Sequence, residues 1–280
     1  MRWFDDLWLK EGFATFTAYK AMERIMPEMM AWKVFYERVK QAAYQTDSTK
    51  GTTPIYQKIP NLSAAKSAYG NIVYNKAPAF LRQAEFYLGE DKFQAAVRAF
   101  LKKHEFGNAG WEDLVEEFAD AAWFDARRGY HFRDKEAFRT KEAEAAQRKY
   151  IREWASSWVS QPGLPTVRVR VGGLEKENAN DLLSIRMDEE GATNGEPRWR
   201  QDTRMFIQVS GQSPQIFNRS LPPGWGESQT LGSVLLSVPP KSPVLVFPNY
   251  HDYGYGIFLL DEKSREYVLK NIQNEKDPFL

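Results

Sequence analysis

The hydrophobic pattern of this chain changes its period from helical to strand-like at residues 161–165, where two prolines and a glycine lie close together. Before this segment, apolar residues recur every three or four positions, which is the spacing of helices that bury one face. After it, residues 167–171 alternate strictly between valine and arginine, as in a strand with one buried side. The switch therefore predicts an α+β multidomain chain, in which a helical part precedes a strand-rich part.

The helical part is expected to consist of several separate helices. We expect them over about 6–26, 27–45, 78–88, 90–107, 111–122 and 151–158, with a loop over 47–60. Pro78 suits a first helical turn but should hold Ala77 away from helical geometry. Charges alternate in sign over about 124–148, which indicates an inserted, solvated helical excursion.

The strand-rich part is expected to consist of short strands separated by turns. We expect strands at 167–171, 182–187, 204–209, 234–238 and 244–247, and then a helix over 261–272. Several short strands with glycine-rich and proline-rich turns between them suggest a small β-sandwich.

Composition excludes several classes of function. The 38 basic residues nearly balance 37 acidic ones, so neither nucleic acid nor an anionic membrane is indicated as a partner. No apolar run is long enough to predict a membrane span. The sequence has no cysteine, and its three histidines (His104, His131 and His251) lack metal-site spacing. None of these features indicates a cellular compartment.

The first predicted helix carries a carboxylate in an apolar setting. Glu11 shares a stripe with Leu7 and Ala14, while Leu9 and Phe13 cover the opposite side. A helix that is apolar nearly all round is usually buried, so we expect Glu11 to point into an interior. A buried carboxylate needs a partner, either an arginine, lysine or backbone donor, or a metal ion.

The sequence around Glu11, WFDDLWLKEGFA at residues 3–14, resembles the segment that carries the third zinc ligand in the aminopeptidase N-like zinc peptidases, or gluzincins. In that family a His-Glu-x-x-His helix supplies two imidazoles and a general base, and a second helix supplies a glutamate. Three protein ligands leave the fourth zinc position open for water. The resemblance implies that Glu11 is the third zinc ligand. Lys10 stands where asparagine is common in the family.

The other zinc ligands of that family are absent from this sequence. No His-Glu-x-x-His occurs, because His104-Glu105 is followed by residues that do not complete the motif. The resemblance therefore predicts a fragment that begins just after the His-Glu-x-x-His helix, lacking the N-terminal half of the parent enzyme. We expect such a chain to bind zinc weakly and to be inactive alone. Apolar surface near Trp3, Trp8 and Phe13 would favour self-association.

A second match lies at residues 67–82. Considered alone, Tyr74 is an aromatic residue at a helix entrance, and a packed tyrosine with its hydroxyl hydrogen-bonded is the simpler interpretation. The family carries Y-x-K-G here, and its tyrosine donates a hydrogen bond to the oxyanion that forms when water adds to the peptide carbonyl. The resemblance implies this catalytic role for Tyr74. Tyr69 is a weaker match to a substrate-binding aromatic, Lys76 matches the lysine, and Ala77 replaces the glycine.

The resemblance also implies a domain plan and an activity. Residues 1–162 would be the helical half of a thermolysin-like catalytic domain, 163–262 a β-sandwich, and 263–280 the start of a truncated helical domain. The implied activity is that of a zinc metallo-aminopeptidase acting on the N-termini of peptide substrates. The alternative is a degenerate, non-catalytic peptidase that serves as a peptide-binding or assembly module.

Overall fold

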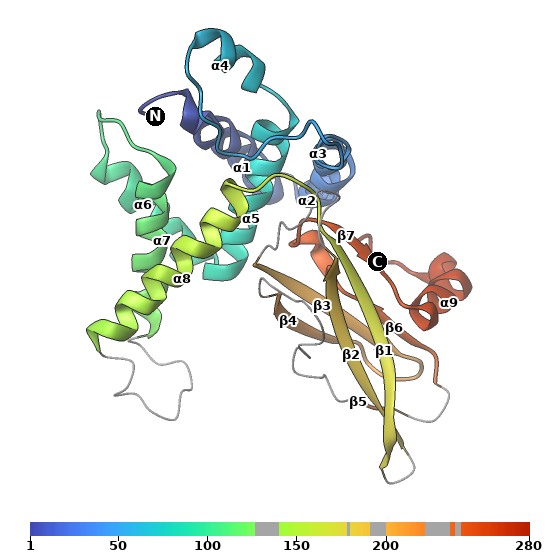
Figure 1. Cartoon of the computed structure of the whole chain (residues 1–280). Helices are drawn as coiled ribbons and strands as arrows, with labels where there is room; N and C mark the ends of the chain where they lie inside the picture. The colour runs from blue at the N-terminus through green and yellow to red at the C-terminus, as the bar shows by residue number, and fades with distance from the viewer. Residues whose placement is uncertain (127–139, 178–179, 191–199, 222–235, 239–241) are drawn as a thin grey trace.

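The computed structural model describes residues 1–126, 140–177, 180–190, 200–221, 236–238 and 242–280 (Figure 1). Helices make up the first part of the chain, and strands make up most of the remainder. The predicted α+β class is therefore confirmed, with the change from helix to strand between α8 and β1. His131 and the middle of the predicted insertion lie outside the described residues.

The helices of the described residues are α1 (Leu7–Ile25), α2 (Ala31–Val34), α3 (Gln41–Asp47), α4 (Leu62–Ala68), α5 (Ala77–Leu88), α6 (Glu90–Lys103), α7 (Trp111–Ala126), α8 (Lys141–Val159) and α9 (Glu262–Asn271). Two π-helical turns, Phe35–Lys40 and Ile72–Lys76, join α2 to α3 and lead into α5. No helix among these residues has the length and apolarity needed to cross a bilayer.

Two local predictions are wrong. The expected helix over 27–45 does not begin at Pro27, because Met30 adopts a left-handed conformation with φ of 47° and α2 starts after it. Ala77 is helical, with φ of −57° and ψ of −43°, although it precedes Pro78. Ala77 is fully buried and faces Gly12 of α1. Tertiary packing here outweighs the preference of residues before proline for extended geometry.

The core of the helical part is rich in tryptophan. The Phe80 ring lies 5.7 Å from Trp8, 5.3 Å from Trp154 and 6.0 Å from Trp158, measured between ring centroids. These four side chains come from α1, α5 and α8 and are at most 1% exposed. The expected exposure of Trp8 is therefore wrong, whereas Trp3 is 44% exposed.

The strands form two sheets. They are β1 (Thr166–Glu177), β2 (Asn180–Glu190), β3 (Gln201–Val209), β4 (Gln215–Leu221), β5 (Leu236–Val238), β6 (Val244–Phe247) and β7 (Ile257–Leu259). One sheet has the order β5-β2-β1-β7 and the other β4-β3-β6, and β4 and β7 were not expected. Val167 and Ile185 of the first sheet share one apolar core with Ile207 and Val246 of the second.

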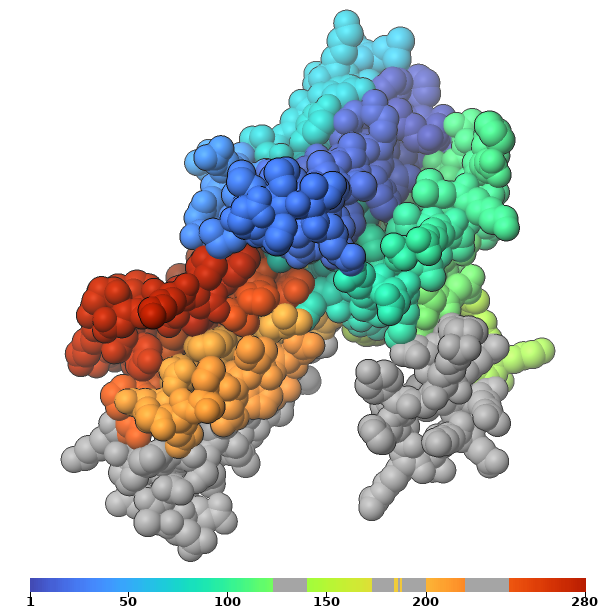
Figure 2. Space-filling model, turned by 180° about the vertical axis from the view of Figure 1, so that it is seen from behind, coloured from blue at the N-terminus to red at the C-terminus, as the bar shows by residue number. Residues whose placement is uncertain are grey.

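The helical and strand-rich parts meet at the segment between β6 and β7. Figure 2 shows the N-terminal helices, in blue, lying against the C-terminal segments, in red. Tyr255 of this segment belongs to the helical core, where its ring lies 4.9 Å from Tyr44 and 6.0 Å from Trp158. Beyond β7, α9 packs on β6, and the Ser264 hydroxyl accepts a hydrogen bond from the amide of Val246. The two parts are thus joined by buried side chains as well as by the chain.

Candidate active site

Glu11 lies in α1, beside an open stripe of the helix surface. Its side chain is 13% exposed and its carboxylate lies 3.0 Å from the Lys10 ammonium. The next residues of the same stripe, Ala14 and Ala18, are exposed, so α1 is not buried all round as expected. Glu11 therefore lies at the edge of the interior. Its carboxylate is paired with a lysine, one of the partners expected for a carboxylate that is largely removed from water.

Tyr74 lies on the π-helical turn Ile72–Lys76, and its side chain meets Glu11. The charge of the Glu11 carboxylate acts on the Tyr74 hydroxyl, and Tyr74 is 36% exposed. Partial removal from water, together with the negative charge of Glu11, raises the pKa of the Tyr74 phenol. The phenol is therefore a hydrogen-bond donor at neutral pH.

Tyr69 completes the cluster. Its ring centroid lies 6.3 Å from that of Tyr74, with a tilt of 39° between the rings, and the residue is 41% exposed. The hydrogen bond and charge of Glu11, and then the two phenols, raise the pKa of Lys10. The structure thus brings the three site residues that the sequence indicated, Glu11, Tyr69 and Tyr74, to one surface with Lys10 among them.

Gly12 is a residue of this site that the sequence analysis did not single out. A Cβ atom placed on Gly12 would lie 2.9 Å from the Cβ of Ala77, closer than such atoms approach in proteins. The missing side chain lets α1 approach the start of α5, and this approach places Glu11 beside Tyr74. A glycine inside a helix costs about 1 kcal/mol relative to alanine. A glycine inside an apolar helix was therefore the sequence signal that could have indicated a close helix contact at this position.

Replacement of Gly12 by valine is expected to lower the free energy of unfolding by about 1–3 kcal/mol, because the added side chain overpacks the contact with Ala77. Urea denaturation followed by circular dichroism measures the loss. Gly51→Val is the matched control, since its Cβ would meet only the Thr49 hydroxyl, at 4.0 Å. A Gly12→Val chain as stable as the unsubstituted one would refute the close-packing argument.

The residues present do not by themselves fit a zinc ion. Among the described residues, no three histidine, cysteine, aspartate or glutamate side chains gather closely enough to hold a metal. Structural and catalytic zinc sites need at least three protein ligands, and this cluster offers the single carboxylate of Glu11. His104 packs on Phe100, with ring centroids 5.3 Å apart, and His251 packs on Tyr250, at 4.0 Å.

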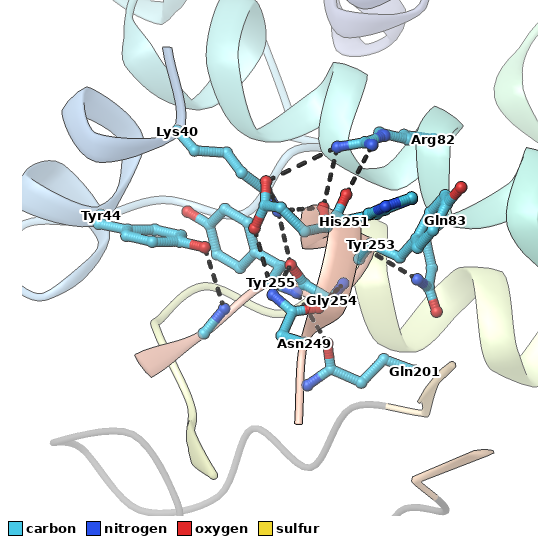
Figure 3. A network of polar contacts seen from close by, with 12 residues as sticks. Lys40, Tyr44, Arg82, Gln83, Gln201, Asn249, His251, Tyr253, Gly254 and Tyr255 are labelled. Atoms are coloured by element: carbon cyan, nitrogen blue, oxygen red, sulfur yellow. Dashed lines mark hydrogen bonds and ion pairs between the residues drawn. The ribbon is translucent and has the colours of Figure 1, made fainter. Parts of the chain in front are cut away.

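A second, larger polar network lies at the junction between the two parts (Figure 3). The Lys40 ammonium lies 2.9 Å from the Asp252 carboxylate and donates to the carbonyl of Gly254. Arg82 donates to the carbonyls of His251 and Asp252, at 2.7 and 3.0 Å. Burial lowers the pKa of Lys40 to about 8 and raises that of Asp252. These charges are sealed from solvent, so we assign them a structural role.

Residues 1–128 match the model of the peptidase family M1 domain. The resemblance to the aminopeptidase N-like peptidases is thereby confirmed over this segment of the chain.

Several proteins named as aminopeptidases are similar to this chain. A leucyl aminopeptidase of Saccharolobus solfataricus is 30% identical over 185 residues, covering 66% of this chain and 20% of the relative. Aminopeptidase 2, mitochondrial, of Saccharomyces cerevisiae is 33% identical over 127 residues, covering 45% of this chain and 13% of the relative. Aminopeptidase M1 of Arabidopsis thaliana is 27% identical over 201 residues, covering 71% of this chain and 19% of the relative. The chain spans at most about a fifth of the length of these relatives.

Proposed function

We propose that this chain is part of a zinc metallo-aminopeptidase that removes N-terminal residues from peptides. The observation that carries the proposal is the proximity of Glu11 and Tyr74, which lie on separate elements yet are close enough for the Glu11 carboxylate to raise the pKa of the Tyr74 phenol. In the family pattern these positions are the third zinc ligand and the oxyanion donor. The similarity of the chain to M1 aminopeptidases supports the same assignment.

The chemistry of the two side chains suits these roles. A neutral phenol can donate to an oxygen on which negative charge develops, and such a fixed donor lowers the barrier to acyl transfer. The raised pKa of Tyr74 keeps the phenol protonated in neutral and mildly alkaline solution. The Glu11 carboxylate is an oxygen ligand of the kind that zinc accepts. Tyr69, beside Tyr74, is proposed to contact the substrate.

We propose the matching domain plan on the same basis. Residues 1–162 would be the helical half of a thermolysin-like domain and 163–262 a β-sandwich, with 263–280 the start of a further helical domain. Two separate apolar cores, one within the helical part and one between the two sheets, support the first boundary.

We further propose that this chain is inactive alone and binds zinc weakly. The sequence contains no His-Glu-x-x-His, and one carboxylate does not replace two imidazoles and a general base. The proposal therefore assigns the remaining zinc ligands to the part of the relatives that this chain does not span.

A zinc titration by calorimetry, run beside an aminoacyl-fluorogenic assay, tests these proposals. We expect zinc affinity weaker than micromolar and no zinc-dependent turnover. Glu11→Gln should remove the residual affinity, because it neutralises the proposed ligand. Glu28→Gln, at an exposed glutamate beyond the end of α1, should leave it unchanged. Submicromolar binding or turnover would refute the inactivity, and equal affinity of the two variants would exclude Glu11 as a ligand.

A further inference from the structure

The π-helical turn that carries Tyr74 ends in a fully buried lysine. Lys76 is 0% exposed, and its ammonium lies 2.6 Å from the Asp47 carboxylate. It also donates to the carbonyl of Gly163 at 3.1 Å, in the segment that joins the two parts of the chain. The end of the turn is thus held by a charged contact that reaches away from the candidate active site.

Asp47 connects this lysine to three other segments. One carboxylate oxygen accepts from the Gly163 amide at 2.8 Å and from the Thr52 hydroxyl at 2.6 Å. The other accepts from the Tyr255 hydroxyl at 3.0 Å. Tyr255 belongs to the segment between β6 and β7, and its ring also lies 5.2 Å from the Lys76 ammonium. The contact therefore joins the Tyr74 turn to the strand-rich part.

Tyr74 and Lys76 occupy opposite sides of the same turn. Residues two apart in a helical turn do not face each other, because each step rotates the chain by about 100°. Tyr74 accordingly reaches the surface cluster while Lys76 enters the junction. A rotation of this turn about its axis would move both side chains, so fixing the ammonium also fixes the direction of the phenol.

Stability alone does not explain this arrangement. Burial lowers the pKa of Lys76 to about 8, so the loss of hydration outweighs the attraction of Asp47. Buried ion pairs of this kind are often no more stabilising than apolar residues of similar volume. What the ion pair supplies and an apolar contact lacks is one defined position for the lysine ammonium, set by the Asp47 carboxylate, the Gly163 carbonyl and the Tyr255 ring.

We propose that Lys76 is a positioning residue that directs Tyr74 toward Glu11 and makes this orientation depend on Tyr255 of the strand-rich part. Asp47 is the shared acceptor through which the two parts are coupled. The catalytic meaning of this coupling rests on the proposed function of Tyr74, whereas the coupling itself is a property of the folded chain.

The test measures how far Glu11→Gln shifts the NMR resonance of Tyr74, first in the otherwise unsubstituted chain and then in chains that carry a second substitution. Fluorotyrosine is incorporated into the chain, and the ¹⁹F resonance of Tyr74 is assigned with Tyr74→Phe. Glu11→Gln should shift this resonance in the otherwise unsubstituted chain, because the charge of Glu11 acts on the Tyr74 phenol. In a Lys76→Met background the shift should fall to less than half, because the phenol no longer faces position 11.

Two further variants separate positioning from general destabilisation. Lys40→Met removes a lysine that is equally buried in the same junction but does not touch Asp47, so the shift should be retained. Tyr255→Phe removes only the hydroxyl that donates a hydrogen bond to Asp47, so it should also reduce the shift caused by Glu11→Gln. This variant tests the proposal even if Lys76→Met fails to fold. An unchanged shift in Lys76→Met or Tyr255→Phe, or an equal loss in Lys40→Met, would overturn the proposal. None of these readouts depends on peptidase activity.

Discussion

Replacement of Asp252 by asparagine is expected to lower the free energy of unfolding by about 3–5 kcal/mol, the usual cost of removing one partner from a buried ion pair. Asp252 is the anion for two buried cations, since its carboxylate lies 2.9 Å from Lys40 and 3.7 Å from Arg82. Both cations are at most 3% exposed. Without the carboxylate they keep only neutral oxygen acceptors, and their burial shields them from the bulk solvent that could otherwise offset the lost charge.

Asparagine isolates the effect of the charge. Asp252 adopts a left-handed backbone with φ of 56°, which asparagine tolerates better than most other residues and alanine does not. An Asp252→Ala variant would therefore mix backbone strain with the electrostatic loss. Asparagine also preserves the volume of the side chain next to Asn249, whose amide donates to Asp252 at 3.2 Å.

Urea denaturation at neutral pH measures this prediction. Glu266→Gln is the matched control, because Glu266 forms an exposed ion pair with Lys270 at 3.9 Å, and we expect a change within about 0.5 kcal/mol. A loss below 1 kcal/mol in Asp252→Asn would show that the carbonyls of the junction stabilise Lys40 and Arg82 without the carboxylate.

The elements that the sequence predicted well are those with strong local signals. The first helix was expected over about 6–26 and spans Leu7–Ile25, since Asp6 and Pro27 mark its ends. The valine alternation at 167–171 lies within β1. The π-helical turns were missed because they are defined by hydrogen-bond spacing, which leaves no compositional signal. β7 was missed because its three residues pair with β1 from far along the chain.

In the candidate site, too, local motifs were visible in the sequence, whereas long-range contacts were not. Glu11 and Tyr74 could be singled out because each lies in a short motif that resembles a family motif with a defined chemical role. The contacts that position them were not predictable, because they join residues that are distant in sequence, such as Asp47 to Tyr255. The expectation that the first helix is buried nearly all round was wrong, since periodicity counts apolar residues but does not say which ones another segment covers.

The second large effect is expected for Phe80→Ala, which should lower the free energy of unfolding by about 3–5 kcal/mol. The Phe80 ring is fully buried and contacts three tryptophan rings, Trp8 from α1 and Trp154 and Trp158 from α8. Truncation leaves a cavity between the two helices, and three large rigid rings cannot collapse far into it. The loss should therefore approach the upper end of the range for buried aromatic residues.

Phe106→Ala provides the matched control, because it is the same substitution in the same part of the chain at a fully exposed side chain. We expect its free energy of unfolding to change by no more than about 0.5 kcal/mol. Tryptophan fluorescence should shift in Phe80→Ala and not in Phe106→Ala, since only Phe80 touches the indole rings. If both variants unfold at the same urea concentration, the tryptophan cluster is not the core that holds α1 against α5. The juxtaposition of Glu11 and Tyr74 would then need another support, because that packing fixes the two elements on which they lie.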